Sequence, residues 1–583
     1  MANNVAGEQF NDVRPQDASP GTSTETQKET SAPDTVGAIE VDNSGSVLIK
    51  IATLYAEQLM SDINLVVGGV SYPAHRLILC ATSEVFQVML MNREWSEWCE
   101  SAIELKETQQ CAEVFPHFLR YFYTGQILIS QKTVLPVLSL ADKYNVKDLV
   151  SLCVSYMSRH LAHAVLLGHL VEWLQYTMAC GHLQVAKACQ NCIKWNLETI
   201  ADTANFGNLE PDVLISLLNQ NDLVVHNEIG LYQLVVRWLD HQRTRLLAME
   251  GVQEHEAEEH MSQLVAATMS HVRFPMMGPR KLAQLLLSPL VQRYKDFFVE
   301  RMAIAMSFHS GDIELINKIY STDDGKLLFT PRLYTEDRWS SMLTIDNFHS
   351  LQCYHTRTFV FSSHSALAEC AGDRTCEWVI DLYPKGVWFK KSLMICWQGS
   401  HEVPETVLRT VRLAVTCRDP PKPRTVTMPW GEVNYDKDEE PFMRVKIGIL
   451  ITGVQRGIEH VMIVKERIFH FSDTQRVLNI DHVLDFDELN TPIYTPPSCS
   501  SSQQNSTNTS GRYSSPSGRK CCHCSKASMD CSKCPTYNAS CTCAAPEPPA
   551  NLVGPNRDQL KIQVVIIPLT NVSCVSASEF GFK

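Results

Sequence analysis

Apolar residues near the start of the chain follow first a strand pattern and then a helix pattern. Ile63, Leu65 and Val67 alternate with their neighbours, and Gly68-Gly69 separates them from a second apolar run at 70–72. Because glycine readily takes the positive φ of a tight turn, this pattern predicts a β-hairpin. Ser83 then precedes apolar residues at helical spacing, as an N-cap residue does. The block 47–160 is therefore expected to combine a small sheet with several helices.

Two longer regions follow, and each has one dominant period. Apolar residues in 161–320 form stripes at helical spacing with short polar connectors between them, which predicts an all-α stack of antiparallel helices. After residue 325 the period changes. Val411, Leu413 and Val415 alternate with their neighbours, and 562–567 is a dense β-branched run. Many short strands of this kind predict a β-sandwich over 325–583, so the whole chain is expected to be a multidomain α+β protein.

Two segments lack the composition of a hydrophobic core. Residues 1–46 are rich in Asn, Asp, Glu, Ser and Thr, and we expect a disordered tail there. Residues 496–556 are rich first in Ser, then in Cys and then in Pro, and strand character returns only at Asp558. Since a lone terminal strand is not stable by itself, we expect 496–556 to be a disordered insertion between two strands of one sandwich.

The overall composition limits the classes of function. The 583 residues carry a formal net charge of −13 and include no long Lys/Arg run, which argues against a nucleic-acid partner. No apolar stretch is long enough for a membrane span. The N-terminus also lacks the basic and apolar regions of a secretory signal peptide. We therefore expect a cytoplasmic protein whose 21 cysteines are thiols or metal ligands.

The first block resembles a BTB/POZ domain. The resemblance rests on segments that occur in one order, namely Asp62-Ile-Asn-Leu-Val-Val, Ala74-His75-Arg76, Ser83-Glu-Val-Phe86, Tyr123-Thr124-Gly125 and Leu140-Ala141-Asp142-Lys143-Tyr144. BTB domains are mostly dimerisation and cullin-3-docking modules. The resemblance therefore implies an α+β domain that forms a homodimer and binds cullin-3.

The two later blocks resemble a BACK domain and a TRAF/MATH-like sandwich. Asn221-Asp222-Leu223, Glu228, Trp238 and Val272-Arg273-Phe274-Pro275 match BACK signatures. Residues 378–386 and the closing segment from Leu560 resemble parts of a TRAF/MATH-like sandwich. The order of the three domains is similar to that of the BTB-domain-containing protein seventeen group. The resemblance implies an adaptor that joins cullin-3 to an unidentified protein substrate.

Many BTB domains bind cullin-3 through a hydrophobic-x-Glu motif, and Trp95-Ser96-Glu97 stands at that position. The resemblance implies that Trp95 anchors the interface and that Glu97 supplies a hydrogen bond at its edge. The alternative is that Trp95 packs on its own domain while Glu97 is solvated. The family would extend the contact with helices around 166–178, although Leu170, Leu174 and Met178 equally describe a core stripe.

The cysteine cluster within 496–556 has two interpretations. Cys521-x2-Cys524 and Cys531-x2-Cys534 have the pair spacing of tetrahedral zinc sites. The gap between the pairs is short for a zinc ribbon, and the flanking sequence is of low complexity. We therefore expect a flexible thiol-rich segment, with zinc bound by these four cysteines as the alternative, and no other cofactor.

No catalytic motif is present. A phosphate-binding loop, a nucleophile elbow and a dinucleotide fingerprint are all absent. His255 and His260 are five residues apart, whereas a zinc-protease helix needs a spacing of four, so we expect a solvated acidic loop there. The chain is thus not expected to be an enzyme. Two functions remain, a substrate adaptor of a cullin-3 ubiquitin ligase and a BTB scaffold that homo- or hetero-oligomerises without cullin. The sequence does not identify the substrate or the groove that would bind it.

Overall fold

The computed structural model describes residues 42–249, 253–368, 374–387, 408–420, 425–428, 431–434, 442–490 and 550–569. The chain divides into two compact units, 1–60 and 61–583. The described part of the first unit holds helix α1, Ser44–Ala56. This helix begins inside the tail predicted over 1–46, because Asp42 Oδ1 accepts a hydrogen bond of 2.9 Å from the Ser44 amide. The rest of that tail, 1–41, lies outside the described residues.

A three-stranded sheet and five helices form the first block of the second unit. Strand β1 (Ile63–Val67) pairs antiparallel with β2 (Val70–Ala74) and parallel with β3 (Ala102–Leu105). Gly68 and Gly69 join β1 to β2 with φ of 58° and 81°, so the predicted hairpin is confirmed. The Ser83 hydroxyl accepts a hydrogen bond from the Phe86 amide and caps the third helix, also as predicted. The five helices are α2 (Arg76–Thr82), α3 (Glu84–Met91), α4 (Gln109–Thr124), α5 (Val134–Lys143) and α6 (Lys147–Arg159), and a 3₁₀ turn, η1 (Ser96–Trp98), lies between α3 and β3.

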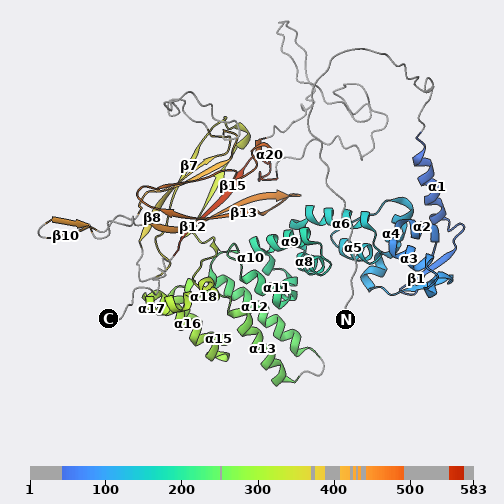
Figure 1. The fold of residues 1–583 in the computed structure, drawn as a ribbon, viewed down its shortest axis with the longest axis horizontal. Coiled ribbons are helices and arrows are strands. Elements are labelled where there is room, and N and C mark those ends of the chain that lie inside the picture. The colour runs from blue at the N-terminus through green and yellow to red at the C-terminus, as the bar shows by residue number, and fades with distance from the viewer. Residues whose placement is uncertain are drawn as a thin grey trace, which may run out of the picture. The chain divides into compact units, whose positions relative to one another are not determined.

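The second block is a stack of helices, as the sequence predicts (Figure 1). Its elements are α7 (Leu161–Leu167), α8 (Leu170–Ala179), α9 (Leu183–Trp195), α10 (Leu197–Ala201), η2 (Ala204–Asn208), α11 (Pro211–Leu218), α12 (Glu228–Leu247), α13 (Glu254–Met269), η3 (Phe274–Met276), α14 (Pro279–Leu285), α15 (Pro289–Arg293), α16 (Lys295–Ser310), α17 (Ile313–Tyr320) and α18 (Asp323–Leu328). The prediction of an acidic loop around His255 and His260 is wrong, because both residues lie in the helix α13. The helix is held there by a hydrogen bond of 2.8 Å from the Tyr294 hydroxyl to Glu258.

The third block is a sandwich of two four-stranded sheets, with orders β13-β12-β15-β6 and β14-β9-β8-β7 (Figure 1). Its strands are β6 (Ser340–Ile345), β7 (Arg357–His364), β8 (Thr375–Tyr383), β9 (Arg412–Cys417), β12 (Met443–Gln455), β13 (Ile458–Phe471), β14 (Val477–Ile480) and β15 (Leu560–Pro568). A separate hairpin pairs β10 (Thr425–Met428) with β11 (Gly431–Asn434), and the short helices η4 (Phe348–Ser350) and α20 (Phe486–Asn490) flank the sheets.

The inner faces of both sheets form one hydrophobic core, and the alternating residues predicted from the sequence face it. Val411, Leu413 and Val415 are fully buried opposite residues of β12 and β15. The predicted insertion, 496–556, has its C-terminal boundary too far along the chain, because residues 550–556 are part of the folded sandwich. Leu552 and Val553 are fully buried, and Leu552 joins the core, so apolar side chains tie this stretch to the sandwich. Residues 491–549 lie outside the described residues.

A short parallel ladder joins the helical stack to the sandwich. Strand β4 (Val224–Val225), which precedes α12, pairs with β5 (Leu333–Tyr334), which leads into β6. Nothing in the local sequence pattern predicted this pairing. The predicted fold class is confirmed, namely an α+β block, an all-α stack and a β-sandwich. Within the described ranges, no helix is both long and apolar enough to cross a bilayer.

Candidate functional site

Residues 95–98, which we call the tryptophan turn, form a surface projection between α3 and β3. Trp95 precedes the single 3₁₀ turn η1, and Trp98 closes it. The two side chains are 47% and 41% exposed, although indole rings of this size are usually covered in a folded domain. Trp95 thus has about half of its side chain accessible to a partner, and its role in docking stays a prediction.

Neighbouring arginines brace the tryptophan turn. Arg76 Nη1 donates a hydrogen bond of 3.1 Å to the carbonyl oxygen of Trp98, and Nη2 donates another to that of Glu100. The backbone amide of Arg76 is held in turn by Asp62 Oδ1 at 2.8 Å. The Arg93 guanidinium lies 5.4 Å from the centroid of the Trp98 ring, in cation–π range. The backbone of the turn is thus held by its neighbours, and Arg93 covers part of the Trp98 ring, while both indole side chains remain partly exposed.

Glu97 adds a negative charge to the turn that carries the two exposed rings. Its carboxylate accepts a hydrogen bond of 2.8 Å from the Ser96 hydroxyl. That bond holds the pKa of Glu97 below its usual value, so the group is ionised at neutral pH. A fixed carboxylate beside exposed indole rings offers a partner both apolar area and a directional acceptor.

A second arrangement of charged groups lies at the junction of the helical stack and the sandwich, and it is buried. Glu228, the first residue of α12, accepts hydrogen bonds of 2.7 Å from the Arg273 amide and of 2.7 Å from the Tyr334 hydroxyl. Arg332 Nε lies 3.2 Å from Glu228 Oε2, and the two side chains are 0% and 1% exposed. These residues come from three separate parts of the chain, so the cluster joins the two blocks.

The two arginines of this junction also satisfy backbone carbonyls. Arg332 donates to the carbonyl oxygens of Leu218 and His271 at 2.5 and 2.7 Å. Arg273 donates to the carbonyl oxygen of Thr330 at 2.6 Å. A buried charge is costly unless it is paired or hydrogen-bonded. Arg332 is both paired with Glu228 and hydrogen-bonded, whereas the Arg273 guanidinium is satisfied by neutral oxygen acceptors.

Lys446 extends the buried junction cluster onto the sheet. Its ammonium donates to the carbonyl oxygens of Asn221 at 2.6 Å and Pro331 at 3.2 Å, and it lies 3.2 Å from Glu466 Oε2. Burial lowers the pKa of Lys446 to about 8. Burial, together with the charge of Arg332, lowers the pKa of Arg273 to about 9. In both groups the loss of hydration on burial disfavours the charged form.

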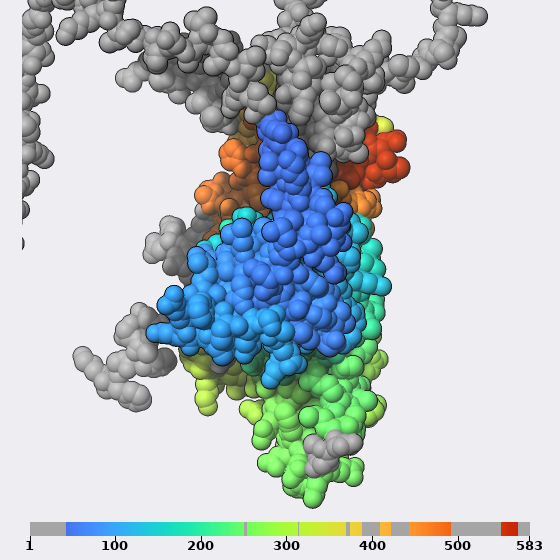
Figure 2. All heavy atoms as spheres, turned by 90° about the vertical axis from the view of Figure 1, so that its right-hand side faces the viewer, coloured from blue at the N-terminus to red at the C-terminus, as the bar shows by residue number. Residues whose placement is uncertain are grey.

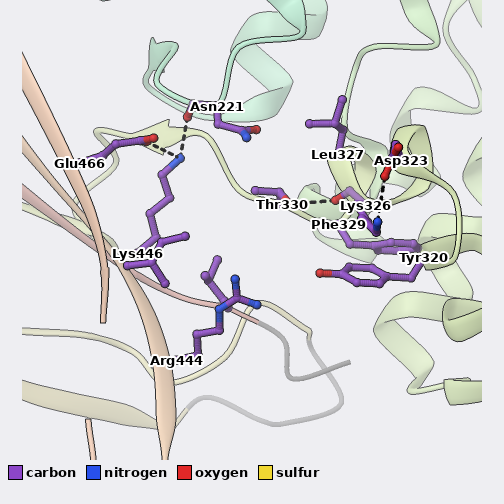
Figure 3. Close-up of a pocket in the computed structure, with 12 residues that line it drawn as sticks. Asn221, Tyr320, Asp323, Lys326, Leu327, Phe329, Thr330, Arg444, Lys446 and Glu466 are labelled. Carbon is purple, nitrogen blue, oxygen red and sulfur yellow. Dashed lines mark hydrogen bonds and ion pairs between the residues drawn. The ribbon is translucent and has the colours of Figure 1, made fainter. Parts of the chain in front are cut away.

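A cavity of about 460 Å³ opens beside the junction, between α17–α18 and the sheet (Figure 3). The rings of Tyr320 and Phe329, with centroids 6.5 Å apart, lie on the helical side. Arg444 and Ile468 line it from the sheet. No pattern in the sequence predicted this cavity, because its helical wall at Phe329 and its sheet wall at Arg444 are more than one hundred residues apart in the chain.

Three family models match this chain, and each covers one of the blocks. They are the BTB/POZ domain at residues 52–161, the BTB And C-terminal Kelch (BACK) domain at 170–287 and the BTBD17 TRAF domain at 329–570. The chain is built from a BTB domain, a BACK domain and a BTBD17 TRAF domain. The resemblances drawn from the sequence are thereby confirmed.

Two kinds of relatives are similar to parts of this chain. BTB/POZ domain-containing protein 17 of Xenopus laevis is 28% identical over 274 residues, which cover 47% of this chain and 53% of that protein. The human protein of that name is 28% identical over 314 residues, covering 53% and 60%. Galectin-3-binding protein of Mus musculus is 24% identical over 325 residues, covering 56% and 53%. The chain thus matches between half and three fifths of the length of each relative.

The predicted site residues divide between the described and the undescribed parts of the chain. In the BTB domain, Trp95 and Glu97 lie on one exposed turn. In the BACK domain, Leu170 and Leu174 are core residues, whereas Met178 is exposed. The four proposed zinc ligands, Cys521, Cys524, Cys531 and Cys534, lie outside the described residues. Among the described residues, no group of three or more His, Cys, Asp or Glu side chains is placed to hold a metal ion.

Proposed function

We propose that this chain is a substrate-recognition adaptor of a cullin-3 ubiquitin ligase. The BTB domain docks cullin-3 and forms a homodimer, and the TRAF domain binds an unidentified protein substrate. The observation that carries the proposal is the braced tryptophan turn, where Trp95 and Trp98 expose their rings beside the ionised Glu97. Domains of these types act as adaptors or scaffolds, so transfer of ubiquitin belongs to the ligase partners, and we propose no catalytic site or cofactor.

Exposed apolar side chains of the BACK domain extend the proposed docking surface. Leu166, Leu167, Met178 and Leu183, from α7, α8 and α9, are all exposed. Four large apolar side chains on adjoining helices are unusual on a surface without a partner. Figure 2 shows the face of the molecule on which BTB residues, in blue, lie at the surface. We propose that cullin-3 covers the tryptophan turn and part of this BACK surface together.

Helix α1 supports the proposed homodimer. It buries none of its side chains, and Val47, Leu48 and Ile49 are each more than half exposed. A helix of this length is marginally stable in isolation and gains most of its stability from packing an apolar face. A second copy of the chain would supply that packing in a symmetric interface.

The TRAF domain offers two places to a substrate. Strand β13 lies at one edge of the first sheet and β14 at one edge of the second. Among the described residues, neither strand pairs with a further strand on its outer side. An extended peptide can pair with such an edge through its main chain. The cavity that Arg444 lines is next to β13 and offers a cation and aromatic rings for a side chain of that peptide (Figure 3). A cytoplasmic location follows from the proposal, since cullin ligases act there.

A pull-down with the N-terminal region of cullin-3 tests the proposal. The wild type should be retained, and Glu97→Lys should lose most of the signal, because it puts a cation where the acceptor stood. Glu300→Lys is the matched control, since it reverses a charge on an exposed residue of the BACK domain. Equal retention of all three proteins would overturn the placement of the docking site.

A scaffold that pairs with other proteins without cullin-3 is the alternative function. The similarity to galectin-3-binding protein favours it, because that name states a protein partner for the relative. The same pull-down separates the two functions. If the wild type dimerises and retains no cullin-3, the scaffold function replaces the adaptor function.

A further inference from the structure

A cavity of about 560 Å³ lies where the end of α6, the β12–β13 turn and the segment 550–557 meet. Its lining includes Arg159, Arg456 and Arg557, together with Ser158 and Gln455, and none of the described residues that line it is acidic. We call it the arginine pocket. Three arginines with no acidic residue among the described neighbours in the lining are unexpected in a chain of net charge −13. The local charge is therefore positive and open to an anion.

The walls of the arginine pocket are tied together by hydrogen bonds. Gln455 Nε2 donates to the carbonyl oxygen of Ser158 at 3.1 Å, and Gln455 Oε1 accepts from the Ala162 amide at 2.8 Å. The Val454 amide donates to the carbonyl oxygen of Ala550 at 2.7 Å. The turn between β12 and β13 is thus fixed both to the helices and to the segment that carries Arg557.

Two of the three arginines have an unusual backbone conformation. Arg456 and Arg557 have φ of 52° and 50°, in the left-handed region. That region is readily occupied by glycine and tolerated by asparagine, whereas a long side chain there is uncommon. Gly457 follows Arg456 with φ of 90°, so both central residues of the turn are left-handed. Asn-Gly is the ordinary sequence of such a turn, and an arginine in its place points to a role for the side chain.

The surrounding charges leave the pocket cationic. The nearest acidic residue of the turn, Glu459, is already bound by Lys561 Nζ at 3.0 Å and by the Gly554 amide at 3.0 Å. Burial raises the pKa of Tyr156 on α6, and the positive charge of Arg456 opposes that rise, so Arg456 lies near the helix. Arg159, on the same helix, donates one hydrogen bond to the Ser155 hydroxyl. A guanidinium group has five N–H donors, so Arg159 can also donate to a bound anion.

We propose that the arginine pocket binds a phosphate monoester. Guanidinium groups match phosphate oxygens in planar, two-pronged hydrogen bonds, and three of them from three elements can surround one phosphate. The cavity is larger than a bare phosphate ion, so the ligand carries more than the phosphate group. That chemistry has two sources, a phosphorylated segment of a partner protein and a free phosphorylated small molecule. The site is independent of cullin docking, since it involves no residue of the tryptophan turn.

Calorimetry on the full-length protein at low and moderate salt tests this site. The probes are a phosphoserine peptide, its unphosphorylated form, myo-inositol hexakisphosphate and sulfate. The variant Arg456→Asn with Arg557→Asn removes two cations, and asparagine keeps the left-handed backbone accessible. The matched control is Arg237→Gln with Arg293→Gln, which removes two exposed cations from the BACK domain.

The wild type and the control should bind at least one phosphate monoester more tightly than sulfate, with an affinity that falls as salt rises. The double variant should bind at least tenfold more weakly. Preference for the phosphopeptide over its unphosphorylated form identifies a protein source, and preference for the inositol phosphate a small molecule. If the double variant is unstable, Arg159→Gln alone should weaken binding at least threefold. Equal affinity of wild type and variants, or no binding of either phosphate probe, overturns the proposal.

Discussion

The tryptophan turn and the buried junction use charge in opposite ways. At the turn, the Glu97 carboxylate accepts one hydrogen bond from Ser96, and the Trp95 and Trp98 side chains on the same turn are 47% and 41% exposed. At the junction, Glu228 is buried and meets Arg332, Tyr334 and the Arg273 amide within one cluster. An exposed charge contributes little to folding and is free to serve a partner. A buried charge must be matched by its own chain, so its role is to fix how the BACK and TRAF domains join.

Removing the central acid of the junction should have the largest effect. Glu228→Gln leaves the Arg332 guanidinium buried without a counter-charge, which typically costs about 3–5 kcal/mol of unfolding free energy. Urea unfolding of the full chain measures this loss. The control Asp202→Asn breaks the exposed pair with Arg237 and should cost under about 1 kcal/mol. Similar losses for the two variants would contradict the contrast between buried and exposed charge.

The pH dependence of stability should report on the same cluster. The pKa of Lys446 falls from 10.5 to about 8 on folding, so between these values the unfolded chain binds more protons than the folded chain. The buried ammonium therefore penalises folding fully below pH 8, and the penalty lessens as pH rises toward 10.5. Relative to Lys446→Met, the wild type should gain roughly 3 kcal/mol across this window, at about 1.4 kcal/mol for each unit of pKa change. Thermal unfolding of both proteins from pH 7 to 10.5 measures the gain, and parallel curves would contradict it.

Deleting the cysteine-rich stretch should have the smallest effect. Joining Asn490 to Ala550 through a short Gly/Ser linker should change the unfolding free energy by less than about 0.5 kcal/mol, because the core residue Leu552 is kept. Extending the deletion through Arg557 removes Leu552 and should cost about 2–5 kcal/mol. Thermal unfolding compares the two. A large loss from the shorter deletion, with stoichiometric zinc in the intact protein, would make Cys521, Cys524, Cys531 and Cys534 structural ligands.

Local features of this fold were predictable from the sequence, and long-range ones were not. Gly68-Gly69 and Ser83 act through their own backbone neighbourhood, so their turn and cap could be assigned from the pattern alone. The alternation of Val411, Leu413 and Val415 gives the buried face of a strand for the same reason. These signals are short in range because they depend on the conformation of a few residues.

The buried junction carries no such local signal. Glu228 and Arg332 are 104 residues apart in the chain. In the sequence alone, neither differs from a charged residue on the surface, and only the fold brings the two together. The arginine pocket is similar, because Arg159, Arg456 and Arg557 come from three distant elements. The tryptophan turn was found only through a family motif, and the structure added that its rings are exposed and its backbone braced.

Calorimetric titration of cullin-3's N-terminal region into the full-length protein tests the proposed function most directly. Trp95→Ala with Glu97→Lys removes the aromatic anchor and reverses the charge beside it. Truncation of a central aromatic typically costs about 2–4 kcal/mol, or roughly 30- to 1000-fold in affinity. The double variant should lose binding by at least that factor while light scattering still gives the dimer mass, which shows that the BTB domain remains folded. Unchanged affinity of the double variant would contradict the docking role of the tryptophan turn.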